Sequence, residues 1–218
     1  MRNRLPACAS QAGINPEKRS ERETIQSIAT IDAIVTPKKP IFAEKIKFMT
    51  AKTPEESKTI QTDLVLPGET NPLNNLFGGE LLARMDKAAS IAARRHSRRI
   101  VVTASVNHVA FNKAVPLGSV VTVEAKVSRT FKTSMEIFLD VWIEDRESGR
   151  RTKANEAIYT FVAVDDTGNP VPVPPIEPQT KLEMERYDAA LRRKQLSLVL
   201  AGKMKPEEAT ELKALFTQ

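Results

Sequence analysis

The sequence predicts an α+β fold in which one long helix packs on one face of an antiparallel sheet. A single helical pattern spans about 79–96, and four segments with alternating apolar residues follow it, at 100–111, 119–131, 134–145 and 151–165. Only short turns join the last three segments, whereas parallel strands need crossover connections of a dozen or more residues. One helix followed by a run of antiparallel strands defines this fold class.

A short strand and a loop precede the helix. We expect the strand at "QTDLVLP" (61–67) and the loop at 67–78, because proline and glycine end the strand. The side of the helix toward the core is mostly alanine, and small residues let a sheet approach closely. At 100° per residue, the opposite side gathers the charged residues Glu80, Arg84, Lys87 and Arg95.

The three segments after residue 118 alternate between apolar and polar residues. They are rich in β-branched residues, which is typical of strands, and Gly149 in the turn at 146–150 can take a positive φ. Their apolar faces are Val121, Val123, Ala125 and Val127, then Met135, Ile137, Leu139, Val141 and Ile143, and finally Ala154, Ile158, Thr160, Val162 and Val164.

Three regions follow from composition. Residues 1–48 are polar and lack sustained periodicity, so we interpret them as a leader that is disordered or arises from a mis-assigned start. An organelle-targeting peptide is a weaker alternative, because acidic residues fit it badly. The domain occupies 49–178 and ends in a proline-rich stretch that cannot continue a sheet. Residues 179–218 form a C-terminal helical extension, with two helical segments joined at Gly202.

Charge and composition exclude several classes of protein. Residues 1–48 hold nine Lys and Arg against five Asp and Glu, and the rest of the chain holds 24 against 22, so the domain is nearly neutral. Aromatic residues make up only 5%, and we expect no nucleic-acid binding. No apolar run approaches the roughly 18–20 residues that cross a bilayer. We therefore expect no membrane insertion and a cytoplasmic protein whose single Cys8 forms no internal disulfide.

Many catalytic mechanisms lack their sequence signatures. The chain contains no G-x-S-x-G, no G-x-G-x-x-G and no Walker loop. His96 and His108 are the two histidines, which is too few for a histidine-based metal site. We interpret His96 as a cap that suits the negative end of the helix dipole, and His108 as a packed, hydrogen-bonded residue.

The remaining chemistry centres on Asp86 and the loop before the helix. Asp86 falls on the stripe of the helix that should be buried, where a carboxylate needs a partner or a chemical task. Gly78 and Gly79 stand at the helix start, whose free N–H groups can hold a developing negative charge. Asn75 offers an amide that can orient a carbonyl or a water. With Asp86 acting as a base on water, this set can transfer an acyl group to water, and a thioester suits it because its carbonyl is electrophilic and thiolate leaves readily.

Two structural interpretations of the same residues stay open. The glycine pair can simply be a tight helix start. Asp86 can pair with an arginine from a facing element, in which case its charge is structural.

Several separated motifs resemble one enzyme family. The stretches "LPGETNPLNNLFGGELLARMDKAASIAARRH", "VVTASVNHVAF", "KTSMEI" and "YTFVAVDDTGNPVPVP" resemble, in this order, the hotdog-fold acyl-CoA thioester hydrolases. This group includes the brain-type cytosolic acyl-CoA hydrolase and its short bacterial relatives. The resemblance covers about 60–176 and implies a hotdog fold, in which an antiparallel sheet wraps a long central helix.

The resemblance also implies an assembly and a catalytic pair. Two protomers would join their sheets edge to edge, and bacterial members often assemble further as trimers of dimers. By position, Asn75 and Asp86 match the catalytic asparagine and acid, which come from different subunits. Asn74 replaces a glycine of many relatives, and asparagine tolerates a left-handed conformation. Phe77 replaces a histidine of some members.

Coenzyme A carries phosphates, so basic residues near the site should contact it. It is part of the substrate, and we expect no separate cofactor. The turn at 132–137 lies near the coenzyme by family likeness, and each basic residue can equally belong to a solvated face. The candidate contacts are Phe77, Arg94, Arg95, Arg98, Arg99, Arg129, Lys132, Thr133 and Ser134.

The sequence therefore predicts an acyl-CoA thioesterase that yields a fatty acid and free coenzyme A. One alternative is a hydratase or dehydratase of the same fold, which typically uses a histidine that the loop lacks. Another is a non-catalytic acyl-CoA sensor. The acyl chain length does not follow from the sequence.

Overall fold

The computed structural model describes residues 49–145 and 148–216. Our interpretation of 1–48 as a leader therefore lies outside the described residues. The elements follow the predicted order: η1 (Pro54–Ser57), β1 (Thr59–Leu64), η2 (Pro67–Glu69), α3 (Gly78–Ser97), β2 (Ile100–Phe111), β3 (Val120–Thr130), β4 (Ser134–Glu144), β5 (Arg151–Val164), α4 (Lys181–Leu200), η3 (Pro206–Glu208) and α5 (Thr210–Lys213).

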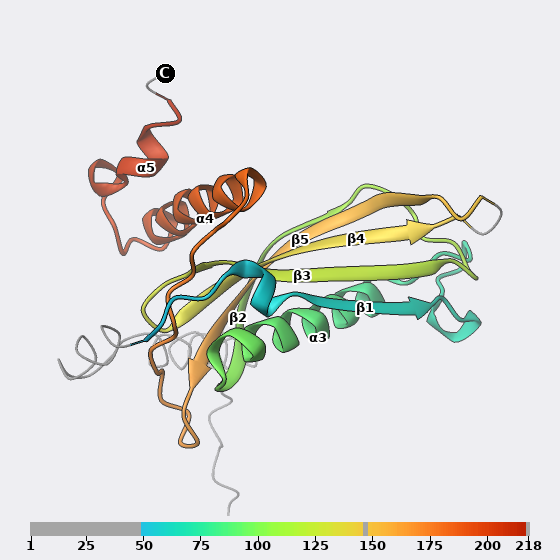
Figure 1. Ribbon diagram of the computed structural model, residues 1–218. Coiled ribbons are helices and arrows are strands. Elements are labelled where there is room, and N and C mark those ends of the chain that lie inside the picture. The colour runs from blue at the N-terminus through green and yellow to red at the C-terminus, as the bar shows by residue number, and fades with distance from the viewer. Residues whose placement is uncertain (1–48, 146–147, 217–218) are drawn as a thin grey trace, which may run out of the picture. The chain divides into compact units, whose positions relative to one another are not determined.

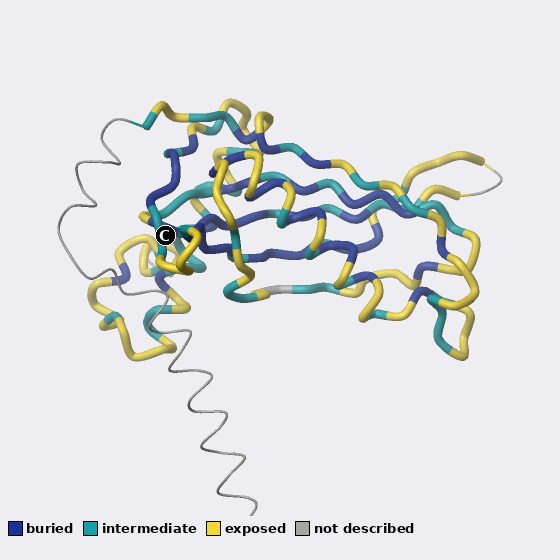
Figure 2. Tube along the Cα trace, turned by 90° about the horizontal axis from the view of Figure 1, so that it is seen from below, coloured by how far each residue is buried: buried dark blue, intermediate teal, exposed yellow. Residues whose placement is uncertain are grey.

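The strands form one antiparallel sheet in the order β1-β3-β4-β5-β2, and α3 packs on one face of it (Figure 1). The alanine-rich side of the helix is buried, and the central strands are mostly buried as well (Figure 2). The apolar face predicted for β3 is at most 1% exposed. The α+β prediction is therefore confirmed, with a core between α3 and the sheet.

The predicted face of β5 is wrong beyond Ala154. The main core contains Ala157, Tyr159, Phe161 and Ala163, whereas the predicted Ile158, Val162 and Val164 are buried outside it. The pairing of β4 with β5 shifts between Val141 and Trp142, which leaves Ala154 as an extra residue in β5. A bulge of this kind reverses the alternation beyond it, and no periodicity in the sequence reveals its position.

β2 is a long, free edge of the sheet. Within the described residues it pairs only with β5, and its register shifts between Thr103 and Ser105 and again between Val106 and His108. Val102, Val106 and Phe111 on this strand are exposed. An edge strand with apolar side chains is a ready surface for pairing with another strand. The side chain of His108 lies outside the described residues.

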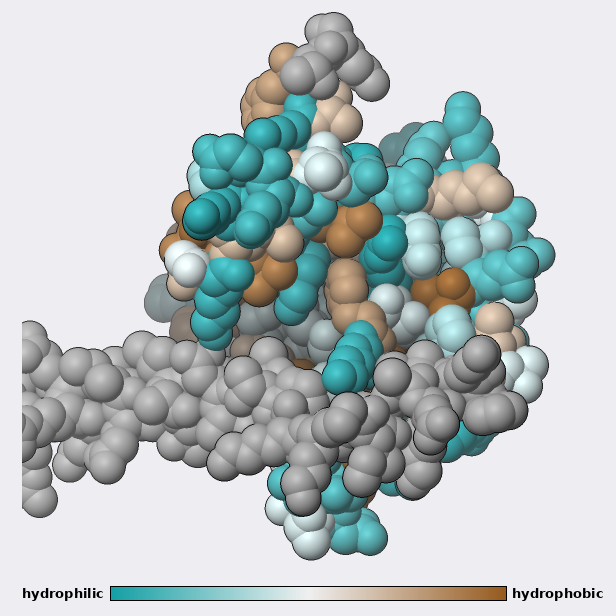
Figure 3. Space-filling view, turned by 90° about the vertical axis from the view of Figure 1, so that its left-hand side faces the viewer, coloured by the Kyte–Doolittle hydropathy of each residue, from teal (hydrophilic) through white to brown (hydrophobic). Residues whose placement is uncertain are grey.

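The C-terminal extension packs on the sheet face opposite α3. Two ion pairs hold α4 there, with Arg186 to Asp140 and Arg193 to Glu136 both at 2.7 Å. The second predicted helical segment contains only η3 and the short α5, because a segment of this length is marginal as a helix. Figure 3 shows apolar side chains among hydrophilic ones at this end of the protein. No helix of the described residues is long and apolar enough to cross a membrane.

Candidate active site

Backbone hydrogen bonds hold the loop between β1 and α3. Leu76 N donates to Val115 O at 2.7 Å, and Leu117 N donates to Asn74 O at 2.8 Å. Asn74 has a φ of 55°, the left-handed conformation that asparagine adopts more readily than most residues. The loop therefore accommodates asparagine at the position where many relatives carry glycine.

Helix α3 begins at Gly78 with an open N-terminus. The N-cap residue is Phe77, and its side chain caps none of the described N–H groups. A Cβ built on Gly78 would lie 3.6 Å from the Phe111 ring, an ordinary contact, and Gly78 has no positive φ. Neither the backbone nor the packing of the described residues requires glycine here. Its effect is to leave open the approach to N–H groups that carry partial positive charge.

Asp86 lies two turns into α3 and is half-buried against β2. The Thr103 hydroxyl donates to Asp86 Oδ1 at 2.8 Å. The ion pairs found within 49–145 and 148–216 do not include Asp86, so the structure does not support the alternative of an ion pair with an arginine. The β2 register shift follows Thr103 directly, and bulges often re-aim side chains beside active sites.

Tyr159 is a buried neighbour of Asp86 that the sequence did not single out. Burial raises the pKa of the phenol to about 12, with a further contribution from the charge of Asp86. The phenol lies 3.3 Å from the Leu82 carbonyl, to which it donates. Tyr159 therefore stays protonated at neutral pH and provides an uncharged wall beside the carboxylate.

Two asparagines of the loop present side-chain amides. Asn71, which the sequence analysis did not propose, accepts hydrogen bonds on Oδ1 from Leu73 N at 2.9 Å and Asn75 N at 3.2 Å. Its amide nitrogen has no partner in the described part of the chain, so it can donate to a ligand. The Asn75 side chain likewise makes no hydrogen bond within those residues.

Within one protomer the loop and Asp86 lie on different sides of α3. The loop contacts the helix through Glu69 and Arg84, whereas Asp86 faces Thr103 on β2, and residues two positions apart in a helix are about 200° apart around the axis. Asp86 is also eight residues beyond Gly78, about 12 Å along a helix axis, so the first N–H groups of α3 are too far from it to act on the same reacting atoms in one protomer.

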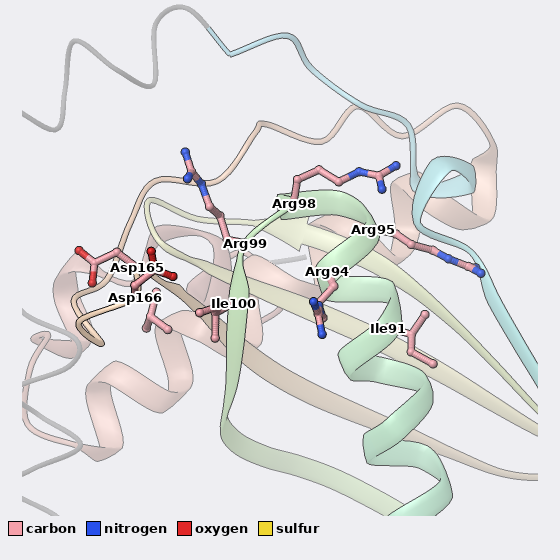
Figure 4. Close-up of a pocket in the computed structure, with 9 residues that line it drawn as sticks. Ile91, Arg94, Arg95, Arg98, Arg99, Ile100, Asp165 and Asp166 are labelled. Carbon is pink, nitrogen blue, oxygen red and sulfur yellow. The ribbon is translucent and has the colours of Figure 1, made fainter.

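Four arginines at the end of α3 surround a hollow of about 610 Å³ (Figure 4). We call it the arginine hollow, and it is lined by Arg94, Arg95, Arg98 and Arg99 with Ile91, Ile100, Val164, Asp165 and Asp166. The structure thus brings four of the predicted coenzyme A contacts together. Arg95 also has a structural role, because its Nη1 donates to the Lys58 carbonyl and to Thr59 Oγ1 at 3.1 Å.

The other predicted coenzyme A contacts do not line the arginine hollow. Arg129 donates to the Tyr187 carbonyl at 2.9 Å and stacks 3.8 Å from its ring, so it holds α4. Lys132, Thr133 and Ser134 lie at the turn between β3 and β4, where Thr133 is buried.

Two side chains of α3 differ from the sequence prediction. Arg84, expected on the charged side, is only 7% exposed and pairs with Glu69 at 2.8 Å. His96, expected to cap the helix, is fully buried and shares a 2.8 Å hydrogen bond with Pro174 O. Burial lowers the pKa of His96, which favours the neutral ring. Both side chains meet segments that pass over the helix, and helical periodicity carries no information about such segments.

Comparisons with known proteins identify the family. Residues 73–149 match the family described as the Thioesterase superfamily. The uncharacterized acyl-CoA thioester hydrolase YkhA of Bacillus subtilis is 42% identical over 147 residues, which cover 65% of this chain and 86% of that protein. A crystal structure of a hexameric acyl-CoA thioesterase is 40% identical with a TM-score of 0.68, covering 70% of this chain and 98% of that chain. The chain belongs to the Thioesterase superfamily and, within it, to the hotdog-fold acyl-CoA thioester hydrolases.

An acyl-CoA hydrolase from Staphylococcus aureus, solved with butyryl coenzyme A and coenzyme A, is 34% identical with a TM-score of 0.65, covering 75% of this chain and 99% of that chain. It has also been solved with alanine replacing one aspartate, one threonine or one asparagine. There the aspartate lies fifteen residues after the asparagine and seventeen before the threonine. In this chain the same spacings from Asp86 lead to Asn71 and Thr103.

Proposed function

We propose that this protein hydrolyses acyl-CoA thioesters to a free acid and coenzyme A. The observation that carries the proposal is the setting of Asp86, whose carboxylate accepts a hydrogen bond from Thr103 and lies beside a free sheet edge. Asp86 takes a proton from water as the water attacks the thioester carbonyl. Family membership supports acyl-CoA as the substrate class. The reaction uses no metal and no separate cofactor.

We assign the amide role to Asn71 in place of Asn75. The spacing from Asp86 supports Asn71, and its Oδ1 is already engaged by two backbone N–H groups, which turns its amide nitrogen toward a ligand. Asn71 then donates to the thioester carbonyl. The N–H groups of Gly78 and Gly79 hold the oxyanion at the helix start.

The proposed site is shared by two protomers. In one chain Asp86 faces β2, whereas the loop that carries Asn71 contacts Arg84 on the other side of the helix, and the first N–H groups of α3 lie about 12 Å from Asp86 along the axis. Pairing of two β2 edges would bring Asp86 of one protomer to the loop of the next and cover Val102, Val106 and Phe111. We further propose that three such dimers assemble, because a similar solved enzyme is a hexamer.

The arginine hollow is the proposed position of the phosphates of coenzyme A. Arg94, Arg98 and Arg99 supply the charge there, and guanidinium groups bind phosphate through paired hydrogen bonds. Replacing Arg94 or Arg99 by methionine should raise KM for acyl-CoA and leave kcat unchanged.

A thiol-trapping assay with short acyl-CoA substrates tests the proposal. Asp86→Ala should lower kcat by about 10²–10⁴ in a protein that still folds and assembles, and Asp63→Asn on β1 is the matched control. Asn71→Ala and Asn75→Ala distinguish the two amides, because only the catalytic one should abolish turnover. Wild-type hydrolysis by Asp86→Ala would refute the mechanism.

The same assay separates the alternatives. Binding of acyl-CoA without thiol release would indicate a sensor. Hydration of an unsaturated acyl-CoA without thiol release would indicate a hydratase. His96 does not support the hydratase, because it lies ten residues beyond Asp86, about 15 Å along the helix.

A further inference from the structure

A partly buried ion pair outside the proposed catalytic groups joins α3 to the loop before it. Arg84 Nη2 donates to both carboxylate oxygens of Glu69 at 2.8 Å and to the Leu64 carbonyl at 3.3 Å. Arg84 is 7% exposed, whereas the Glu69 side chain is 28% exposed, so the guanidinium is shielded from water and the carboxylate is partly accessible. The contacts tie the end of β1, the 3₁₀ turn η2 and the second turn of α3 to one another.

Glu69 also forms hydrogen bonds with residues at both ends of the loop. Its Oε2 accepts a hydrogen bond from Leu66 N at 2.8 Å, where the loop leaves β1. Its backbone carbonyl accepts one from Phe77 N at 2.8 Å, immediately before the first helical residue. The Leu66 N–H and then the Arg84 guanidinium lower the pKa of the Glu69 carboxyl, so it is ionised at neutral pH.

The loop would otherwise be fixed mainly from one side. Its later part is bonded to the segment around Val115, but Leu73 at its tip is 79% exposed. Asn71 lies two residues beyond Glu69 and is itself half-buried. The carboxylate of Glu69 is therefore the side-chain contact that ties the part of the loop before Asn71 to the second turn of α3.

Arg84 and Asp86 are two residues apart, which places them about 200° apart around the helix. Asp86 faces β2, where Thr103 binds it, and Arg84 faces the loop. One rigid helix thus fixes the carboxylate on one side and the amide-bearing loop on the other.

We propose that Arg84 and Glu69 are a positioning pair, which sets the amide of loop 69–77 for acyl-CoA hydrolysis. The inference rests on the proposed function. In the proposed dimer each helix α3 contributes to both sites. It carries Asp86 for one site, and through Arg84 it orients its own loop for the other site. Misplacing a reacting group by about 1 Å can cost 10²-fold in rate, so a loosened loop should affect kcat more than substrate binding.

Three variants and a matched control test the pair. Arg84→Met and Glu69→Gln should each lower kcat at least tenfold with KM within threefold of wild type. Arg84→Lys should recover part of the loss, since a single nitrogen, Nη2, makes all three hydrogen bonds, and lysine keeps one charged donor nitrogen on a different stem. The double variant should be no slower than either single variant, because both remove one interaction. The control, Arg186→Met, breaks the Arg186–Asp140 pair on the far face of the sheet and should lower Tm while kcat stays unchanged.

Hydrogen exchange of the loop provides a readout independent of turnover. Backbone N–H groups in 69–77 should exchange at least tenfold faster in Arg84→Met and Glu69→Gln, and at the wild-type rate in Arg186→Met. The inference is overturned if loop exchange is unchanged, or if kcat is unchanged while Tm falls as in the control. If the wild-type protein releases no thiol, the proposed function is refuted. Hydrogen exchange of the loop would still show whether Arg84 and Glu69 hold the loop in place. Should Arg84→Met not fold, Glu69→Gln gives the same decision.

Discussion

Replacing Gly78 by alanine should make the protein more stable and less active. The added Cβ would lie 3.6 Å from the Phe111 ring, and the backbone needs no positive φ at this position. Alanine also lowers the conformational entropy of the unfolded chain. Where the native backbone accommodates alanine, this stabilises the folded protein by about 0.4–1 kcal/mol. For a chain of this size that corresponds to a rise in Tm of about 1–4 °C.

The same methyl group should obstruct catalysis. It would stand at the start of α3, where the proposed oxyanion meets the first N–H groups, and loss of one such donor typically lowers kcat by about 10²–10³. Thermal unfolding and thiol release, measured on one preparation, would report the two effects separately. If Tm rises while kcat falls, misfolding is excluded as the cause of the lost activity.

Gly68→Ala is the matched control for this variant. Gly68 belongs to the same loop region, has no positive φ, and an added Cβ would meet no atom within 4 Å. It should leave kcat and KM unchanged. If Gly78→Ala hydrolysed acyl-CoA as fast as Gly68→Ala, the role of the helix start in holding the oxyanion would be wrong.

Three further predictions follow from single contacts. Thr103→Val removes the 2.8 Å hydrogen bond to Asp86. Such a bond to a charged acceptor is worth about 1.5–3 kcal/mol, so its loss should lower kcat about 10- to 100-fold in the thiol assay. An unchanged kcat would contradict the role of Thr103 in orienting Asp86. Burial lowers the pKa of His96 below the 6.5 of the unfolded chain. The stability that the neutral ring contributes is therefore present above about pH 6.5 and should be lost as the pH falls. Tm measured from pH 8 to 5 should drop less steeply in His96→Gln than in wild type, and parallel curves for the two proteins would contradict this prediction. Val106→Lys on the exposed edge should shift the protein toward monomer in sedimentation and abolish activity, and an active monomer would exclude the shared site.

The periodicity of apolar residues was sufficient to predict the long helix and the strand that follows it. The helix expected at about 79–96 is Gly78–Ser97, and the strand expected at 100–111 is Ile100–Phe111. In both cases a periodic sequence is bounded by residues that stop it. The buried face of β4 followed from strict alternation, since Met135, Ile137 and Leu139 are fully buried.

Tertiary contacts explain what the sequence could not predict. The bulge at Ala154 moved Tyr159 to the core side beside Asp86, and bulge positions have no periodic signal. Arg84 lies on the charged side of a helical wheel, yet a loop residue fifteen positions earlier buries it. Asn71 precedes a proline in an irregular loop, and only the contacts of its Oδ1 show that its amide nitrogen is available.

The shared site itself can be tested by mixing two inactive proteins. Asp86→Ala and Asn71→Ala each remove one half of both sites in a homodimer, and each variant should be inactive alone. In a mixed dimer, the intact Asp86 of one chain meets the intact Asn71 of the other, so one of its two sites is complete. Random exchange makes half of the dimers mixed, and activity should recover to about a quarter of wild type after the variants are unfolded and refolded together. Two groups acting within one chain would give no recovery at any mixing ratio, and that result would refute the shared site.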